Sequence, residues 1–331
     1  MSFISVIMPT MRAGGLDIVC DGLKNQTFTD FELIIVDGIY KYRKEDIAEK
    51  AKNYKFKIKH IEPFNNPFPK NAFCRYANSG IAHADSEIVV FITDYTYLPP
   101  KCLYAHAMFN MHYPTYGLMC PHQYYELNNV NPVFESYRED IDLHDDAKLY
   151  HHSNSDTQKY ANDIKDGKYN NLMWSILNKE FDYATYNFIL DPVLGNADPK
   201  LEAKVGAIQQ QFFHGKNESC KLSSALKING WSELLDGGHG YQDTDFSDRL
   251  TRYGGVDAWC VEPKIIAKII NPRPIFPHGY RSRSVAENKT IWHEQCSKGY
   301  PITNKYKLSE INNLIKIKNQ CDVALNGIKF E

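Results

Sequence analysis

The chain has 331 residues, of which 43% are hydrophobic and 24% are charged, and its formal net charge is −2. A chain of this length buries a core without disulfides, and its near-neutral charge excludes general electrostatic binding of nucleic acid. Its eight cysteines form no CxxC pair, which excludes the usual zinc-finger spacing and favours a reducing compartment. No stretch offers the roughly 20 apolar residues that cross a bilayer. We therefore expect a cytoplasmic protein, either free or peripheral to a membrane.

The first hundred residues alternate between buried strands and helices. Residues 3–10 (FISVIMPT) and 31–38 (FELIIVDG) are short apolar runs, and the segment between them has apolar positions at helical spacing. A crossover this short favours parallel strands with helices on the faces of the sheet. The alternation continues with expected helices at 42–54 and 72–84 and expected strands at 56–63 and 86–94. These segments predict an α/β fold.

Three polar residues follow these strands and mark a ligand-binding edge. Thr10, Asp37 and Asp94 each stand at the end of an apolar run. Ligands of open α/β sheets bind beyond the carboxyl ends of the strands. These three positions are therefore the first candidates for a site.

The chain changes character at about residue 121, where it becomes polar and rich in tyrosine and asparagine. This segment is typical of a lid or an insertion, while the apolar residues 172–190 are expected to pack on the body. A strand and a helical turn are expected within 208–233. The remaining expected elements are a helix at 242–254, strands at 256–263 and 264–271, and a C-terminal helix at 308–320.

The stretch GYQDTDFSDRL, residues 240–250, has a structural explanation. Asp243 or Thr244 can cap the helix, and the order of early acids and later arginines suits the helix dipole. Capping does not explain why GWSELLDGGHGY, with Trp231 near its start, leads into this helix. A functional reading is therefore needed beside the structural one.

The stretches SVIMPT, LKNQTFTDFELIIVDG, ANSGIAHADSEIVVFITD and INGWSELLDGGHGYQDTDFSDRLTRYG together resemble the family 2 glycosyltransferases. The resemblance extends over about residues 2–260 and is poor through 121–210. It implies a GT-A fold, with a mixed, mostly parallel central sheet flanked by helices, an acceptor-side subdomain and a C-terminal helical extension. The implied division is a nucleotide-sugar-binding half at 1–120, an acceptor-binding and catalytic half with the polar insertion at 121–275, and the extension at 276–331.

The resemblance implies a nucleotide-sugar donor, with a UDP-sugar favoured, over the carboxyl edge of the sheet. Thr10 and Arg12 would lie near the nucleotide, and Asp37 would contact the base or ribose. Gly38 stands where many relatives carry a second acid, which leaves the identity of the base open. Lys70 and Arg75 would face the diphosphate, which needs positive charge. A solvated helix face explains each of these two cations equally well.

The metal motif that the resemblance implies is incomplete. Relatives hold Mn²⁺ or Mg²⁺ between two nearby acids, but here Asp94 is followed by Tyr95 and Thr96. The expected ligands are Asp94 and the distant His278. Replacement of the metal by cations of the protein, or loss of activity, are the alternatives.

Gln242-Asp243 aligns with the Glu-Asp pair of the family's acceptor loop, which implies that Asp243 is the catalytic base of an inverting transfer. Such a base removes the proton of the acceptor hydroxyl as its oxygen attacks. Trp231, Asp236 and Asp245 are the expected acceptor contacts, although a structural role explains Asp245 equally well.

Two other functions remain open. The missing second metal acid and Gln242 would suit a non-catalytic GT-A binding or scaffold protein. The arginine-rich PRPIFPHGYRSRS would suit a glycosyltransferase that acts on modified nucleic acid bases. A Rossmann oxidoreductase is set aside, because no G-x-G-x-x-G follows the first strand.

Overall fold

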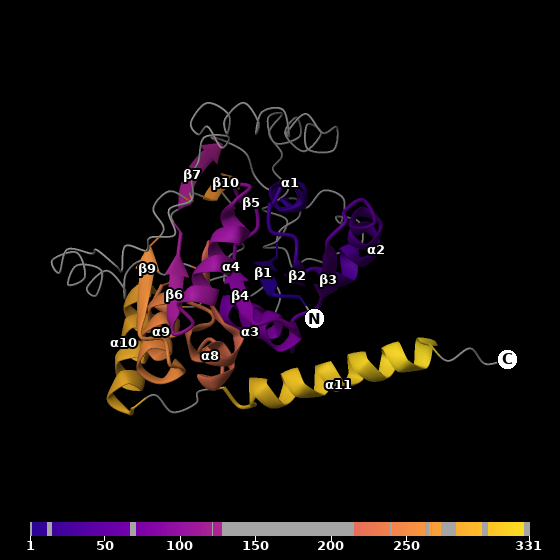
Figure 1. The fold of residues 1–331 in the computed structure, drawn as a ribbon. Helices are drawn as coiled ribbons and strands as arrows, with labels where there is room; N and C mark the ends of the chain where they lie inside the picture. Colours follow the sequence, from indigo (N-terminus) through magenta and orange to yellow (C-terminus); the bar gives the residue numbers. More distant parts are fainter. Residues whose placement is uncertain are drawn as a thin grey trace, which may run out of the picture.

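A computed structural model describes residues 2–11, 15–66, 71–120, 122–127, 215–238, 240–261, 265, 267–272, 283–299 and 304–327 (Figure 1). Its elements in the first half are β1 (Ile4–Thr10), α1 (Leu16–Lys24), β2 (Phe31–Asp37), α2 (Tyr40–Ala51), β3 (Lys57–Ile61), α3 (Phe73–His83), β4 (Ile88–Phe91), β5 (Thr96–Tyr97), α4 (Cys102–His112), β6 (Tyr116–Met119) and β7 (His122–Leu127). Those in the second half are β8 (Glu218–Lys221), α8 (Leu222–Lys227), the 3₁₀ turn η3 (Glu233–Leu235), α9 (Gln242–Arg249), the π-helical turn η4 (Leu250–Gly254), β9 (Ala258–Val261), β10 (Ala267–Pro272), α10 (Val285–Ser297) and α11 (Leu308–Gly327).

The main sheet of the described residues has seven strands in the order β3-β2-β1-β4-β8-β6-β9. Strand β1 pairs in parallel with β2 and β4, and β2 pairs in parallel with β3. Strand β8 is antiparallel to β4 and β6, and β9 is parallel to β6. The expected mixed, mostly parallel sheet flanked by helices is therefore confirmed. The described residues also form a second, smaller sheet, with the strand order β5-β10-β7.

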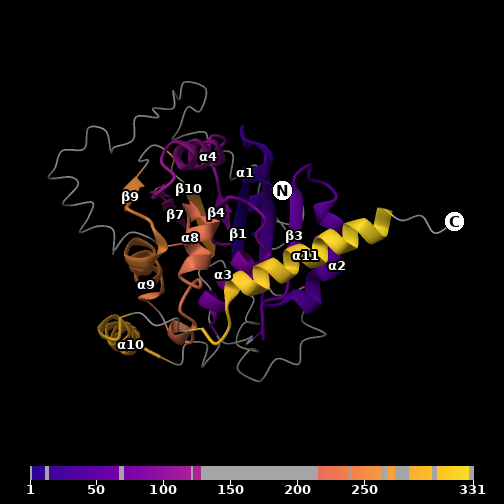
Figure 2. The same ribbon diagram turned by 60° about the horizontal axis from the view of Figure 1, so that its bottom comes forward.

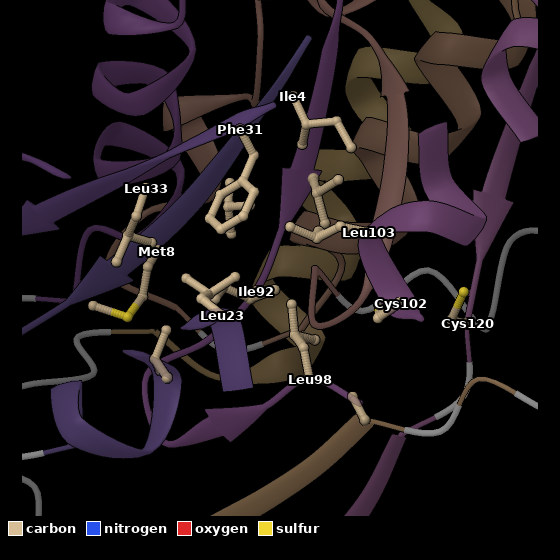
Figure 3. Close-up of a cluster of buried hydrophobic side chains, with 14 of the residues drawn as sticks. Ile4, Met8, Leu23, Phe31, Leu33, Ile92, Leu98, Cys102, Leu103 and Cys120 are labelled. Carbon is tan, nitrogen blue, oxygen red and sulfur yellow. The ribbon is translucent and has the colours of Figure 1, made fainter. Parts of the chain in front are cut away.

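The alternation of side chains along the strands divides the core into two clusters, one on each face of the main sheet. In β2, Leu33 and Ile35 belong to one cluster, while Ile34 and Val36 belong to the other. The first cluster also takes residues from α1 and α4 (Figure 3), and the second takes residues from α3, α8 and α9. Because both faces are covered, these strands read as continuous apolar runs in the sequence.

The N-terminus of α3 is capped by a side chain that lies more than 160 residues away along the chain. The residue before the helix, Ala72, offers no side-chain acceptor. Asp236 replaces it, since its two carboxylate oxygens accept from the backbone N–H groups of Cys74 at 2.8 Å and Arg75 at 3.1 Å. These are two of the amide groups that the first turn of a helix leaves without a partner. The loop after η3 is thereby fixed to α3.

The C-terminus of α3 is capped by α11. The buried side-chain amide of Asn312 donates to the carbonyl oxygens of Ala82 at 3.0 Å and Ala84 at 2.8 Å. Midway along α3, the amide of Asn78 pairs with the backbone of Trp231, accepting from its N–H at 2.7 Å and donating to its C=O at 2.9 Å. Helix α3 is therefore bound to two segments that lie far from it along the chain, the backbone of Trp231 and helix α11.

Several elements differ from expectation. Helices α4 and α10 and strands β5, β6 and β7 were not predicted, and α11 extends seven residues beyond the predicted end at 320. Strands from both sides of the predicted boundary at residue 120 share the main sheet, and the division into halves stays a prediction. The predicted packing of residues 172–190, and most of the polar segment, lie outside the described residues. No helix in the described ranges is long and apolar enough to span a membrane.

The cap at the C-terminus of α3 predicts a difference between two adjacent asparagines. Asn312→Ala leaves buried carbonyl groups of α3 without a donor and should lower the free energy of unfolding by about 1–3 kcal/mol. Asn313 is exposed on the same helix, so Asn313→Ala should change stability by less than about 0.5 kcal/mol. Urea unfolding of both variants measures the difference, and equal effects would contradict the capping role.

Candidate active site

The site is built where the order of strands reverses, between β1 and β4. The chain adds β2 and β3 on one side of β1 and then returns to place β4 on the other. Thr10 ends β1, and its hydroxyl donates to a carboxylate oxygen of Asp94, beyond β4, at 2.9 Å. Both side chains are buried. The structure thus brings together two of the residues predicted at the ligand-binding edge.

The side chains of the two residues after Asp94 are buried in the core. Tyr95 has a left-handed backbone (φ 61°) and a buried ring. That ring lies so close to the backbone of Gly15 that a Cβ atom there would be 2.7 Å from it. Thr96, at the position of the second acid of the metal motif, is buried in β5 with its hydroxyl 3.0 Å from that of Thr93. Among the described residues, no group of three or more His, Cys, Asp or Glu side chains could hold a metal ion.

Asp37 lies in a closed network at the end of β2. One carboxylate oxygen accepts from the N–H of Ile39 at 3.0 Å, and the other contacts His60 Nε2 at 2.8 Å and Arg43 Nε. Burial disfavours the charge of Asp37, but Arg43 and His60 outweigh it and hold the pKa of that carboxyl below its usual value. The side chain is fully buried. Its predicted contact with a base or ribose stays a prediction and would require rearrangement of these partners.

The structure explains why residue 38 is a glycine, which the sequence alone did not. A Cβ atom at this position would lie 2.5 Å from the hydroxyl oxygen of Tyr76 and 3.1 Å from Cβ of Met11. The side-chain amide of Asn66 donates to the carbonyl of Gly38 at 2.8 Å. The Tyr76 hydroxyl therefore occupies the space that the side chain of a second acid at position 38 would need. No periodicity in the sequence predicts this contact.

Arg75 is paired within the protein. Its Nε lies 3.1 Å from a carboxylate oxygen of Glu233, and Nη1 donates to the carbonyl of Asn65 at 3.2 Å. Glu233 also accepts from Asn78 at 3.1 Å. The predicted contact of Arg75 with a diphosphate stays a prediction. Three other predicted site residues lie outside the described residues: Arg12, Lys70 and His278.

Asp243 is the second residue of α9 and lies beside the start of the 215–238 segment. A Cβ atom on Gly215 would be 3.6 Å from one of its carboxylate oxygens. Burial raises the pKa of Asp243 to about 7, and the charge of Lys216 opposes that rise only in part. A carboxyl group that titrates near neutral pH is well matched to general base catalysis.

Gln242 holds the loop that precedes α9. Its side-chain amide donates to the carbonyl oxygens of Leu235 at 3.3 Å and Gly238 at 3.1 Å. An ionised glutamate at this position could not donate to either oxygen. The departure from the family's Glu-Asp pair is therefore explained by the packing of the loop.

Three expected acceptor residues have structural partners instead. The ring of Trp231 is fully buried and stacks on Phe246, with centroids 4.2 Å apart, and its contact with an acceptor sugar stays a prediction. Asp245 is fully buried, and one of its carboxylate oxygens accepts hydrogen bonds from two N–H groups of Arg249, at 2.6 and 2.9 Å. This pair supports the structural reading of Asp245. Asp236 caps α3, as described above, and its acceptor contact stays a prediction.

The family model named glycosyl transferase family 2 matches residues 5–183. The chain belongs to glycosyl transferase family 2. This family 2 chain is also similar to solved structures, at identities that show the fold alone. Staphylococcus aureus TarS 1–349 in complex with UDP-GlcNAc matches with a TM-score of 0.51 and 13% identity, over 93% of this chain and 69% of that one.

Two further structures match the family 2 chain with lower TM-scores. S. aureus TarS matches with a TM-score of 0.48 and 14% identity, over 90% of this chain and 43% of that one, so the chain spans less than half the length of that protein. The mannosyltransferase PcManGT from Pyrobaculum calidifontis, in complex with GDP-Man and Mn²⁺, matches with a TM-score of 0.46 and 12% identity. The match covers 97% of this chain and 80% of that one. No curated protein matches the sequence.

The contacts of Gln242 in this family 2 chain generate a stability prediction. Gln242→Glu places a carboxylate against two carbonyl oxygens and should lower the free energy of unfolding at pH 8 by about 1–3 kcal/mol. Because protonation restores a donor, the loss should shrink at pH 5. Urea unfolding at both pH values measures it, and an equal loss at both would count against this explanation.

Proposed function

We propose that this glycosyltransferase moves a sugar from a nucleotide-sugar donor to an acceptor hydroxyl with inversion, and that Asp243 is the base. The observation that carries the proposal is the Asp243 carboxyl, held at the start of α9 with its pKa raised to about 7 by burial. The acceptor hydroxyl transfers its proton to Asp243 while its oxygen attacks the anomeric carbon from the side opposite the leaving diphosphate. Such a base contributes about 10²–10⁴-fold to the rate.

The donor is assigned to the edge where Thr10 and Asp94 meet, 2.9 Å apart. A position beyond the carboxyl ends of β1 and β4 supports this assignment, because the strand order reverses there. We infer a UDP-sugar, since the TarS fragment was solved with UDP-GlcNAc. The base contact remains assigned to Asp37.

A divalent cation would be held by Asp94 and His278. Carboxylate oxygens suit Mg²⁺ and Mn²⁺, but the described residues contain no group of three or more His, Cys, Asp or Glu side chains that could hold a metal ion. When bound, the cation would neutralise charge on the leaving diphosphate. No proton transfer of the proposed reaction depends on it.

The alternatives differ from this proposal in what they bind. A scaffold protein would lack turnover, and membership of the family counts against it. A nucleic acid acceptor draws its support from the basic segment PRPIFPHGYRSRS. Salt-sensitive retention on duplex DNA, with no retention on polysaccharide, would favour that acceptor over a glycan.

The role of Asp243 predicts a loss of turnover without loss of donor binding. Asp243→Asn keeps the size of the side chain but removes the base, so transfer should fall by about 10²–10⁴-fold. Donor affinity from calorimetry should stay within about threefold, since the interaction lost is made in the transition state. Asp248→Asn, on the same helix, is the control and should retain turnover. Equal loss of turnover and affinity in Asp243→Asn would indicate a folding role.

The raised pKa of Asp243 predicts the pH dependence of the reaction. The base must be ionised, so kcat/KM for the acceptor should rise with pH and level off above an apparent pKa of about 7. Burial also raises the pKa of Asp236 to about 7, so the rise is assigned to Asp243 only if the residual activity of Asp243→Asn, in which Asp236 is unchanged, no longer shows it. A profile that is flat from pH 5 to 9, or a rise that survives in Asp243→Asn, would contradict the assignment.

The donor edge predicts a metal-dependent thermal shift. UDP-sugars should raise the melting temperature more than GDP-, TDP- or CMP-sugars, and Mn²⁺ or Mg²⁺ should enlarge the shift. Asp94→Asn should abolish the enlargement by metal, because it removes the charged ligand. A metal effect that survives in Asp94→Asn would place the cation elsewhere.

A further inference from the structure

Helix α10 binds the loop that leads into α9 through one side chain. The amide of Asn288 donates to the carbonyl oxygen of Leu235 at 3.2 Å and to that of Gly240 at 3.0 Å. Figures 1 and 2 show α10 beside α9. We call residues 235–238, 240 and 241 the α9 loop. Because Leu235 and Gly240 lie near its two ends, a single buried side chain joins the start of this loop to its end.

Asn288 is closely fitted to the α9 loop. Its side chain is fully buried, and a Cβ atom on Gly238 would lie 2.3 Å from its Oδ1 and 2.5 Å from its Cγ. The two carbonyl oxygens require a donor, which fixes the orientation of the amide. Its Oδ1 finds no hydrogen-bond partner in the described part of the chain. An asparagine is therefore costly here for packing alone, and its N–H groups do what an apolar side chain could not.

The α9 loop ends in a backbone conformation that needs support. Tyr241, the residue before α9, has φ 68° and ψ −7°. A bulky residue rarely adopts this left-handed conformation, and it persists only where the surrounding structure holds it. The ring of Tyr241 packs against that of Trp292, with centroids 5.3 Å apart. Trp292 is one turn after Asn288 on the same face of α10, so α10 supports both Gly240 and Tyr241.

We propose that Asn288 is a positioning residue, which fixes the turn at Gly240 and Tyr241 and thereby places the Asp243 carboxyl. This inference rests on the proposed function, in which Asp243 is the base. Asp243 is two residues after Tyr241, so a change in the backbone angles of the turn moves its carboxyl group relative to the sheet. A displacement of about 1 Å in a catalytic group can cost about 10²-fold in rate.

Hydrogen exchange of the free protein tests the structural part of the proposal without any ligand. Asn288→Ala should speed exchange at least about tenfold at the amide of Asp245, which donates to the carbonyl of Tyr241 at 2.9 Å. Gly238→Ala should do the same with the amide intact, because its methyl group would meet Asn288. Gln295→Ala, on the same face of α10, is the matched control and should leave Asp245 protected. Unchanged protection in the first two variants, or equal acceleration in the control, would overturn the proposal.

Turnover tests whether this placement matters for the reaction. The probe is UDP-GlcNAc with Mn²⁺, and kcat is the rate of UDP release with water as the acceptor. Asn288→Ala should lower kcat by about 10–100-fold, while the affinity for UDP-GlcNAc from calorimetry should stay within about threefold. Gln295 is buried and accepts from the hydroxyl of Ser232 at 3.2 Å, so Gln295→Ala should lower the melting temperature and keep kcat within about twofold. Equal loss of kcat in both variants, or equal loss of kcat and affinity in Asn288→Ala, would overturn the proposal.

A double-mutant cycle with Asp243 separates this inference from the proposed function. In the Asp243→Asn background, Asn288→Ala should lower the residual turnover by less than about twofold, because the group that it positions is already disabled. A further loss as large as that in the unaltered background would overturn the inference. Full turnover in Asn288→Ala, with loss in Asp243→Asn, would overturn the inference alone. Full turnover in Asp243→Asn would overturn the proposed function and this inference with it.

Discussion

The capping of α3 from outside is the constraint on which the rest of the structure depends. This helix starts at Phe73 without a local cap, and its first amide groups are completed by Asp236. The same Asp236 belongs to the loop that leads into α9 and Asp243. Helix α3 and the loop that leads into α9 are thus joined by hydrogen bonds to a carboxylate, which are among the stronger hydrogen bonds in proteins. The position of Asp243 relative to the sheet follows from this joint.

The departures from the family pattern have physical causes in the packing around them. Gly38 is small because Tyr76 lies where its side chain would be. Gln242 is an amide because two carbonyl oxygens need a donor. Thr96 is part of a strand, paired with Ile269 of β10. Only the last of these departures bears on the proposed metal site, because Thr96 offers no carboxylate there.

The sequence predicted the strands and helices that have a clear pattern of apolar residues. It did not predict features that depend on contacts between residues far apart along the chain. The strands around Val6 and Val90 read as strands because both faces of the sheet are covered. The meeting of Thr10 with Asp94 followed from the rule about strand ends. In contrast, the burial of Trp231 and the capping role of Asp236 arise from contacts with α3, which local patterns do not record. Asp243 was singled out by the resemblance, and its raised pKa adds a separate physical reason.

Hydrogen exchange in an Asp236→Ala variant tests the joint between the two sides most directly. The account predicts faster exchange at the amides of Cys74 and Arg75, which lose their acceptor, and also across residues 237–248, because the loop and the start of α9 are released together. Exchange of β1 and β2 should stay unchanged and serves as the internal reference. Faster exchange confined to the first turn of α3, with residues 237–248 as protected as before, would contradict the claim that this cap positions Asp243.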